Sequence, residues 1–271
     1  MNQPYRNLVI LRAGDRSLHP QWIAGERRTF DLLVSYYGDQ PDLHRDSCDR
    51  YEMRKGPKWS CIADLLREQP EVLDGYDAVW FPDDDLAVDT ATLNRLFALF
   101  HGCGLALAQP ALAHGSYHTW AFLLQRPQHL LRHSEFVEVM APLFSREALR
   151  ICLPSFSESR SGWGLDWVWP HLLADRRAHP IAVIDATPVL HTRPLGGDLY
   201  KNNPELSPQR DDDRLRALYG TALARHTAKH CIGGGWVAHR PGLLERLRTQ
   251  VKMWNARRLH QRRHRPSAPT P

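Results

Sequence analysis

The 271-residue sequence predicts an α/β fold, in which helices cover both faces of a mostly parallel central sheet and a helical extension follows. Two observations favour this fold. Short, nearly continuous apolar runs recur along the first 190 residues, as expected of strands that are buried on both faces. Segments with apolar residues at helical spacing separate several of these runs, and such alternation is typical of an α/β sandwich.

Six apolar runs are predicted to be strands. They cover residues 6–14, 30–39, 76–81, 105–112, 136–145 and 179–191. The first two runs end at Gly14 and Gly38, and the third ends at Pro82, which are residues that commonly interrupt a strand.

Helices are predicted between these runs. Residues 58–69 carry Trp59, Ile62, Ala63 and Leu66 on one face and end at Pro70. A second helix carries Leu93, Leu96, Phe97 and Phe100. The later part of segment 161–173 and the extension 211–255 are also expected to be helical.

The chain divides into a catalytic domain (1–210), the helical extension packed on it (211–255) and a disordered basic tail (256–271). The tail holds five arginines and no acidic residue, so without it 30 basic residues face 30 acidic ones. The tail would contact an anionic membrane or simply aid solubility. Because the remaining sequence is neutral, no nucleic acid partner is expected.

The sequence contains no run long enough for a signal peptide or a membrane span. Its five cysteines are odd in number and lack C-x-x-C spacing, which argues against a disulfide framework or a zinc site. A cytoplasmic protein is the simplest interpretation.

Three consecutive carboxylates, Asp83, Asp84 and Asp85, follow the third predicted strand. Ligands bind at the carboxyl ends of strands in open α/β sheets, so this position favours a site. Adjacent carboxylates repel and are stabilised by a cation, and oxygen ligands favour Mg²⁺ or Mn²⁺ together with a substrate's phosphates. The alternative is a solvated acidic turn. A second triplet, 211–213, follows no apolar run and is interpreted as a helix N-terminus.

Two further segments are predicted to contact a nucleotide. Ala13, Gly14 and Asp15 end the first strand, where a glycine lets a nucleoside approach the backbone. Lys55 and Lys58 lie just before a helix, where cationic side chains and helix amides favour phosphate. A solvated basic turn is the alternative for the lysines.

The Trp-rich segment 161–173 contains one carboxylate, Asp166, which aromatic neighbours would desolvate into a better proton acceptor. Its alternative role is to cap the following helix. His191 ends the last predicted strand, and Arg193 follows it. His191 would join Asp85 on a metal, and Arg193 would contact phosphate.

Several of these motifs together resemble GT-A glycosyltransferases, a Rossmann-like fold. The resemblance implies that D-x-D at Asp83 and Asp85 binds metal and diphosphate, that His191 ligates the metal, and that Asp166 is the general base. More specifically, the runs NLVILRAGD, FDLLVSYYGD, KGPKW, WFPDDDL, LAQPAL, SGWGLD and HTRPLGG resemble the family called domain of unknown function 707 over most of residues 6–200. Where that family has an acidic pair, this chain has the single acid Asp166.

The sequence thus predicts a metal-dependent glycosyltransferase that moves a sugar from a nucleoside-diphosphate sugar, with a UDP sugar preferred, to a saccharide or lipid-linked acceptor. With Asp166 as the base, the reaction would invert the anomeric configuration. A metal-dependent nucleotidyltransferase or phosphoesterase could use the same aspartates. An inactive GT-A-like binding scaffold is the third alternative.

Overall fold

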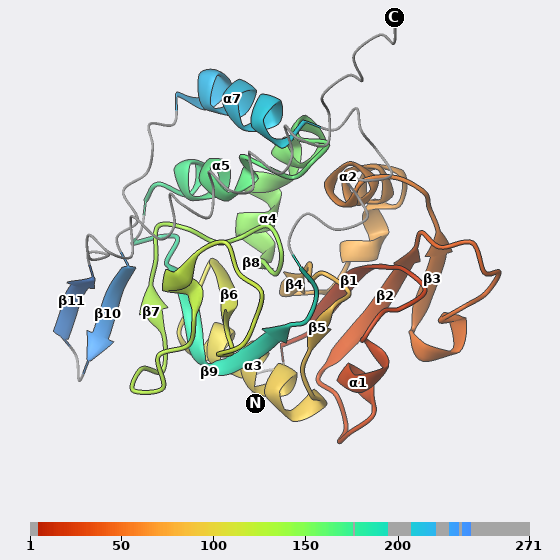
Figure 1. Cartoon of the computed structure of the whole chain (residues 1–271), viewed down its shortest axis with the longest axis horizontal. Helices are drawn as coiled ribbons and strands as arrows, with labels where there is room; N and C mark the ends of the chain where they lie inside the picture. Colours follow the sequence, from red (N-terminus) through yellow and green to blue (C-terminus); the bar gives the residue numbers. More distant parts are fainter. Residues whose placement is uncertain (1–4, 176, 195–206, 221–227, 233–234, 240–271) are drawn as a thin grey trace, which may run out of the picture.

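The computed structural model describes residues 5–175, 177–194, 207–220, 228–232 and 235–239. A large mixed sheet runs through the centre of the molecule (Figure 1). Two apolar cores lie against it, one on each face. The predicted α/β sandwich is confirmed.

The elements of the described residues are as follows. The strands are β1 (Asn7–Ala13), β2 (Phe30–Tyr36), β3 (Arg50–Met53), β4 (Ala78–Trp80), β5 (Leu86–Ala87), β6 (Leu107–Leu112), β7 (Arg132–His133), β8 (Leu143–Ser145), β9 (Ile181–His191), β10 (Ala228–Ile232) and β11 (Gly235–His239). The α-helices are α1 (Pro20–Ile23), α2 (Lys58–Glu68), α3 (Thr90–Gly102), α4 (Arg146–Cys152), α5 (Leu165–Leu172) and α7 (Pro208–Tyr219). The 3-10 helices are η1 (Arg45–Ser47), η2 (Pro70–Leu73), η3 (Ala121–Leu123) and η4 (Leu153–Glu158).

The sheet has the strand order β11-β10-β7-β9-β6-β8-β4-β1-β2-β3, and β5 pairs with the end of β9. The strands β3, β2, β1 and β4 are parallel, as are β6 and β9. The other pairings are antiparallel, so the prediction of a mostly parallel sheet was wrong for the second half of the chain. The reason is that β8 lies between β4 and β6. The chain enters β8 at the carboxyl edge of β4, so β8 is antiparallel to both strands.

Two element predictions need correction. The run 136–145 forms a strand only at Leu143–Ser145, because residues 138–142 cross the edge of the sheet and bond to the chain after β4. The predicted extension 211–255 is helical only in α7 among the residues described. Residues 228–232 and 235–239 form the strands β10 and β11, which pair antiparallel. The predicted domain boundaries stay a prediction.

Successive side chains of β1 point to opposite faces of the sheet, so the strand contributes apolar side chains to both cores. Val9 and Leu11 face the core that α1 and α3 cover, whereas Leu8 and Ile10 face the core that α2, α4, α5 and α7 cover. All four side chains are fully buried. This two-sided burial explains why the strand is a continuous apolar run and why its polar groups lie at its ends.

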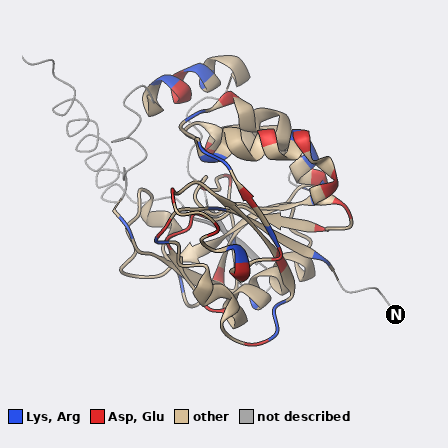
Figure 2. Cartoon of the chain, turned by 90° about the vertical axis from the view of Figure 1, so that its right-hand side faces the viewer, with Lys and Arg blue, Asp and Glu red and all other residues tan. Residues whose placement is uncertain are grey.

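Helix α7 illustrates how charge is distributed on the surface. Acidic and basic residues are interspersed along it (Figure 2). Asp211 lies in its first turn, so the interpretation of the second acidic triplet as a helix start is confirmed. None of the helices in the described part of the chain is long and apolar enough to cross a membrane.

Candidate functional site

The first acidic triplet lies at the carboxyl edge of the parallel half of the sheet. It follows β4, and Gly14, the residue after the neighbouring strand β1, donates its amide to Asp84. The end of β9 joins the same place because β5 pairs with it, placing Leu86 opposite His191. The main chain of Thr192 then donates to the Asp85 carbonyl oxygen (3.1 Å). Pairing of β5 with the end of β9, in which Leu86 and His191 lie 105 positions apart along the chain, thus assembles the site.

Each of the three aspartates has its own cationic partner. The pairs are Lys58 Nζ with Asp83 (2.7 Å), Arg193 Nη1 with Asp84 (2.9 Å) and His191 Nε2 with Asp85 (3.2 Å). The sequence suggested that a metal would be needed to offset the repulsion among these carboxylates. The structure shows that protein side chains already do so, and the case for a metal must rest on other observations.

Asp84 is directed inward, toward the end of β1. Its Oδ2 accepts from the main-chain amide of Gly14 (2.7 Å) and from the Tyr37 hydroxyl (3.4 Å). Burial raises the pKa of Asp84, and the Gly14 amide and Arg193 oppose that rise. A Cβ on Gly14 would lie 2.7 Å from the Tyr37 hydroxyl oxygen. The absence of a side chain at Gly14 therefore makes room for the ring of Tyr37, whose main chain is bonded to Ala13.

Asp15 and Lys55 lie at the outer margin of this region. The carboxylate of Asp15 accepts from the Tyr36 hydroxyl and from Gln40 Nε2. The Lys55 ammonium donates to the Gly38 carbonyl (2.7 Å) and pairs with Asp39 (2.6 Å). The structure therefore brings Lys58, rather than Lys55, to the aspartate triplet.

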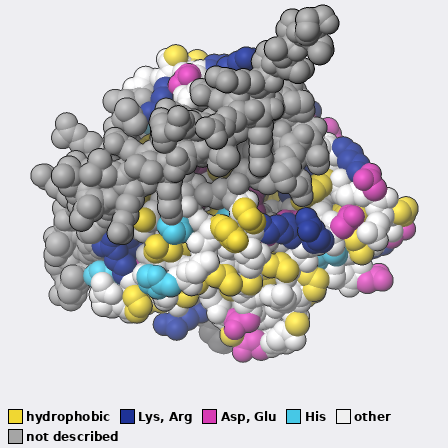
Figure 3. Space-filling model, viewed as in Figure 1, with side chains coloured by type: hydrophobic (Ala, Val, Ile, Leu, Met, Phe, Trp, Pro, Cys, Tyr) yellow, Lys and Arg dark blue, Asp and Glu magenta, His cyan; other side chains and the backbone are white. Residues whose placement is uncertain are grey.

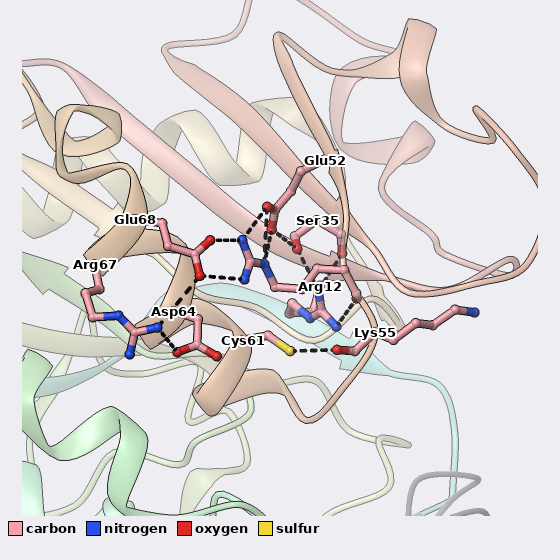
Figure 4. A network of polar contacts seen from close by, with 9 residues as sticks. Arg12, Ser35, Glu52, Lys55, Cys61, Asp64, Arg67 and Glu68 are labelled. Atoms are coloured by element: carbon pink, nitrogen blue, oxygen red, sulfur yellow. Dashed lines mark hydrogen bonds and ion pairs between the residues drawn. The ribbon is translucent and has the colours of Figure 1, made fainter.

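A buried network fixes the turn that carries these lysines (Figure 4). Arg12 of β1 donates to Ser35 Oγ (2.6 Å) and to the carbonyls of Arg54 (2.7 Å) and Gly56 (3.0 Å). Lys58 follows the turn and donates to three main-chain carbonyls besides Asp83. They belong to Phe81 (2.8 Å), Val139 (3.0 Å) and Met140 (3.2 Å). Lys58 thus ties the triplet to segment 138–142.

Asp85 and His191 are the residues that best fit a divalent metal. Asp85 Oδ1 is buried without a hydrogen-bond partner. Burial of an unpaired carboxylate oxygen costs free energy, and a bound metal ion would remove this cost. His191 Nδ1 lies 2.7 Å from the carbonyl oxygen of Tyr117, which orients Nε2 toward Asp85. Asp83 is turned to Lys58 instead. Within the described residues, no group of three such side chains is placed to hold an ion.

Asp166 lies in the first turn of α5, on the other side of segment 138–142. Its Oδ1 accepts from the Val139 amide (3.0 Å). The helix cap is Gly164, with no side-chain capping bond, so Asp166 does not serve as the cap. Burial and the nearby Glu138 raise the pKa of Asp166 well above its usual value.

The aromatic side chains near Asp166 pack against one another in a cluster. Trp167 packs against Phe136 (5.0 Å between ring centroids) and Trp120 (6.0 Å), and Arg216 of α7 lies over it at 5.2 Å. Gly164 adopts a left-handed φ of +92°, and a Cβ there would lie 2.8 Å from Leu215 of α7. Helix α7 therefore braces the turn that presents Asp166.

Glu138 is a buried acid that the sequence analysis missed. It lies in an apolar run that predicted a strand, and a lone carboxylate in such a run was the available signal. Burial raises its pKa to about 7, while His191 opposes the rise and Asp83 adds to it.

Part of the chain matches the model of a known protein family. The model of a family described as protein of unknown function (DUF707) matches residues 126–218. The matched segment contains Glu138, Asp166, His191 and Arg193, and the aspartate triplet precedes it. No curated protein sequence matches this chain significantly.

Two solved glycosyltransferase structures share the fold. Glucosyl-3-phosphoglycerate synthase from Mycobacterium tuberculosis, in complex with Mn²⁺, UDP-glucose and phosphoglyceric acid, is similar with 15% identity and a TM-score of 0.50, over 88% of each chain. GalNAc-T7 with UDP, GalNAc and Mn²⁺ has 9% identity and a TM-score of 0.57, over 80% of this chain and 48% of that one. The chain therefore matches the DUF707 model over residues 126–218 and shares the fold of GT-A glycosyltransferases.

Proposed function

We propose that this chain is a metal-dependent glycosyltransferase that uses a nucleoside-diphosphate sugar, with a UDP sugar preferred. One observation carries the proposal. On a fold whose solved relatives hold UDP and Mn²⁺, Asp85 keeps an unpartnered buried oxygen beside His191 at the carboxyl edge of the sheet.

The donor would lie along the ends of β1, β4 and β9. Asp85 and His191 would hold Mn²⁺ or Mg²⁺, with Asp83 near them, and the ion would stabilise the charge of the departing diphosphate. Arg193 would contact the diphosphate, and the ion pair with Lys58 would hold Asp83 in place. The proposed nucleotide side of the site consists of Ala13, Gly14, Asp15, Lys55 and Asp84.

Asp166 would take the proton of the acceptor hydroxyl, and direct displacement would invert the anomeric centre. The acceptor would be a saccharide or a lipid-linked saccharide. Tyr117 is half-exposed, and its amide donates to the His191 carbonyl (3.1 Å), so this aromatic residue lies beside His191 along the chain edge. Exposed hydrophobic side chains lie beside histidines on the face shown in Figure 3. The predicted basic tail, 256–271, lies outside the described residues, and its contact with an anionic cytoplasmic membrane surface is part of the proposal.

A thermal-shift matrix tests the donor class. UDP, GDP, CDP and ADP, each with and without Mn²⁺, are added to the wild type, to Asp85→Asn and to the control Asp74→Asn. Asp74 is an exposed residue paired with Arg146 at 3.7 Å. Binding at about 100 times Kd adds about 2.7 kcal/mol, which raises Tm by roughly 5–10 °C.

A Mn²⁺-dependent shift with one nucleotide is expected in the wild type and in Asp74→Asn but not in Asp85→Asn. If no nucleotide shifts the wild type, the proposal fails and a binding scaffold becomes the better interpretation. Release of pyrophosphate instead of nucleoside diphosphate during turnover would favour the nucleotidyltransferase alternative.

A further inference from the structure

The ammonium group of Lys58, at the start of α2, is surrounded by four oxygen atoms from two separate segments. Two belong to the chain that follows β4, namely Asp83 Oδ1 (2.7 Å) and the Phe81 carbonyl (2.8 Å). The other two are the carbonyls of Val139 (3.0 Å) and Met140 (3.2 Å), in the segment that precedes β8. Only 15% of the lysine side chain is exposed. An ammonium group has three hydrogen atoms to donate, so these four acceptors occupy all of them.

Main-chain bonds join the same two segments and continue to Asp166. The Asp83 amide donates to the Met140 carbonyl (2.7 Å). One residue earlier in the second segment, the Val139 amide donates to Asp166 Oδ1 (3.0 Å). Lys58 bonds to the carbonyls of both Val139 and Met140, so it lies at the junction that connects the aspartate triplet with Asp166.

We propose that Lys58 is a positioning residue, which clamps the segment around Val139 to the aspartate triplet and so fixes Asp166 relative to Asp85. The inference rests on the proposed function, in which Asp85 binds the metal and Asp166 takes the proton of the acceptor. Lys58 acts on the reaction through these two residues, and its ammonium group touches neither the donor nor the acceptor.

The acceptors of Lys58 lie on both segments, so the segments cannot separate without breaking hydrogen bonds to a charged group. Such bonds are stronger than those between neutral groups. The spacing matters because direct displacement needs the attacking oxygen in line with the anomeric carbon and the leaving oxygen. A misplacement of about 1 Å can lower the rate about 100-fold. Lys58 is therefore expected to act on kcat and to leave the affinity for the donor nearly unchanged.

Hydrogen exchange of single amides, followed by NMR without any substrate, tests the clamp. In Lys58→Met the amides of Asp83 and Val139, which are bonded across the junction, should exchange about tenfold faster, while the amides of β1 keep their rates. Lys55→Met is the matched control. Lys55 belongs to the same turn but is exposed and pairs with Asp39, so its loss should change none of these rates. Unchanged exchange at Asp83 and Val139 in Lys58→Met overturns the clamp.

General destabilisation of the fold would give a different pattern of exchange. An equal acceleration in β1 would mean that Lys58→Met loosens the whole protein, and it would overturn the clamp as a local device. If Lys58→Met does not fold, Lys58→Gln repeats the measurement, because its side-chain amide keeps a hydrogen-bond donor but carries no charge. The same faster exchange at Asp83 and Val139 is expected in that variant.

Release of UDP from UDP-glucose with Mn²⁺, in which water replaces the acceptor, tests the positioning role. Lys58→Met should keep KM within about threefold of the wild type and lower kcat about 100-fold, whereas Asp74→Asn should match the wild type. A raised KM with an unchanged kcat would place Lys58 on the donor, and unchanged values of both would leave it a structural role only. Either result overturns the positioning role. If the wild type binds no nucleotide at all, the proposed function fails, and the exchange rates still decide whether the clamp exists.

Discussion

Binding of a divalent metal to Asp85 and His191 should release a proton, because the protein holds His191 in its protonated form. Burial opposes the charge on the imidazole, but the hydrogen bond to Asp85 and the charge of Asp85 outweigh it and raise the pKa of His191 to about 9. A histidine that ligates a metal must be neutral at the coordinating nitrogen. The metal therefore competes with the proton on Nε2.

The size of the effect follows from this pKa. At pH 7 His191 lies about two pH units below its midpoint, so only about 1% of it is neutral. Metal affinity at pH 7 should then be about 100-fold below its value at high pH, a difference of about 2.7 kcal/mol. Between pH 7 and 8.5 the affinity should rise about tenfold for each pH unit.

Calorimetric titration of Mg²⁺ into UDP-saturated protein, in buffers of different ionisation enthalpy, counts the protons released. Near pH 7 the wild type should release close to one proton per metal beyond the value for His191→Gln. The nucleotide's own phosphate, with a second pKa near 6, contributes equally to both proteins. Equal proton release in the two proteins, or an affinity that does not change between pH 7 and 8.5, would refute the assignment of His191 as a metal ligand.

Three further predictions concern stability. In metal-free protein, the raised pKa of His191 means that its proton stabilises the fold fully below pH 6.5, and this stabilisation is lost as the pH rises toward about 9. Thermal melts with a chelator should show the wild type losing up to about 3 kcal/mol over this range relative to His191→Gln. Arg132→Met leaves the fully buried Asp185 unpaired and should cost about 3–5 kcal/mol, lowering Tm by roughly 6–20 °C in a calorimetric scan. Gly164→Ala should cost about 1–3 kcal/mol in urea unfolding, because its φ is +92° and α7 packs against it. Gly102→Ala, with no atom within 4 Å of the added Cβ, should not destabilise the protein.

The long buried strands could be predicted from the sequence because two-sided burial leaves a continuous apolar run. This held for β1, β2, β6 and β9, and the three-residue β4 was found because it lies within the longer apolar run 76–81. Strands of two to four residues, such as β3, β5 and β7, are too short to show a period. Among these unpredicted strands β5 is the most important for the site, since its pairing with β9 brings His191 to Asp85.

The position of the acidic triplet at a strand end was predictable, but its partners were not. Lys55 and Lys58 look alike in sequence, and only the fold distinguishes the exposed one from the one held by three carbonyls. Glu138 was hidden for a related reason. Its neighbours across space, Asp166 and Gln109, are about 30 residues away along the chain.

The pairing of three aspartates with three cations also bears on how a donor would bind. With His191 protonated, the cluster is close to neutral, so a diphosphate alone would bring uncompensated negative charge to a partly buried edge. A divalent ion that displaces one proton adds one net positive charge, which partly offsets the diphosphate. The nucleotide and the metal should therefore bind as a unit, each weakly without the other. Because Asp85 Oδ1 is the buried carboxylate oxygen of the triplet left without a partner, the coupling between them should depend on this residue.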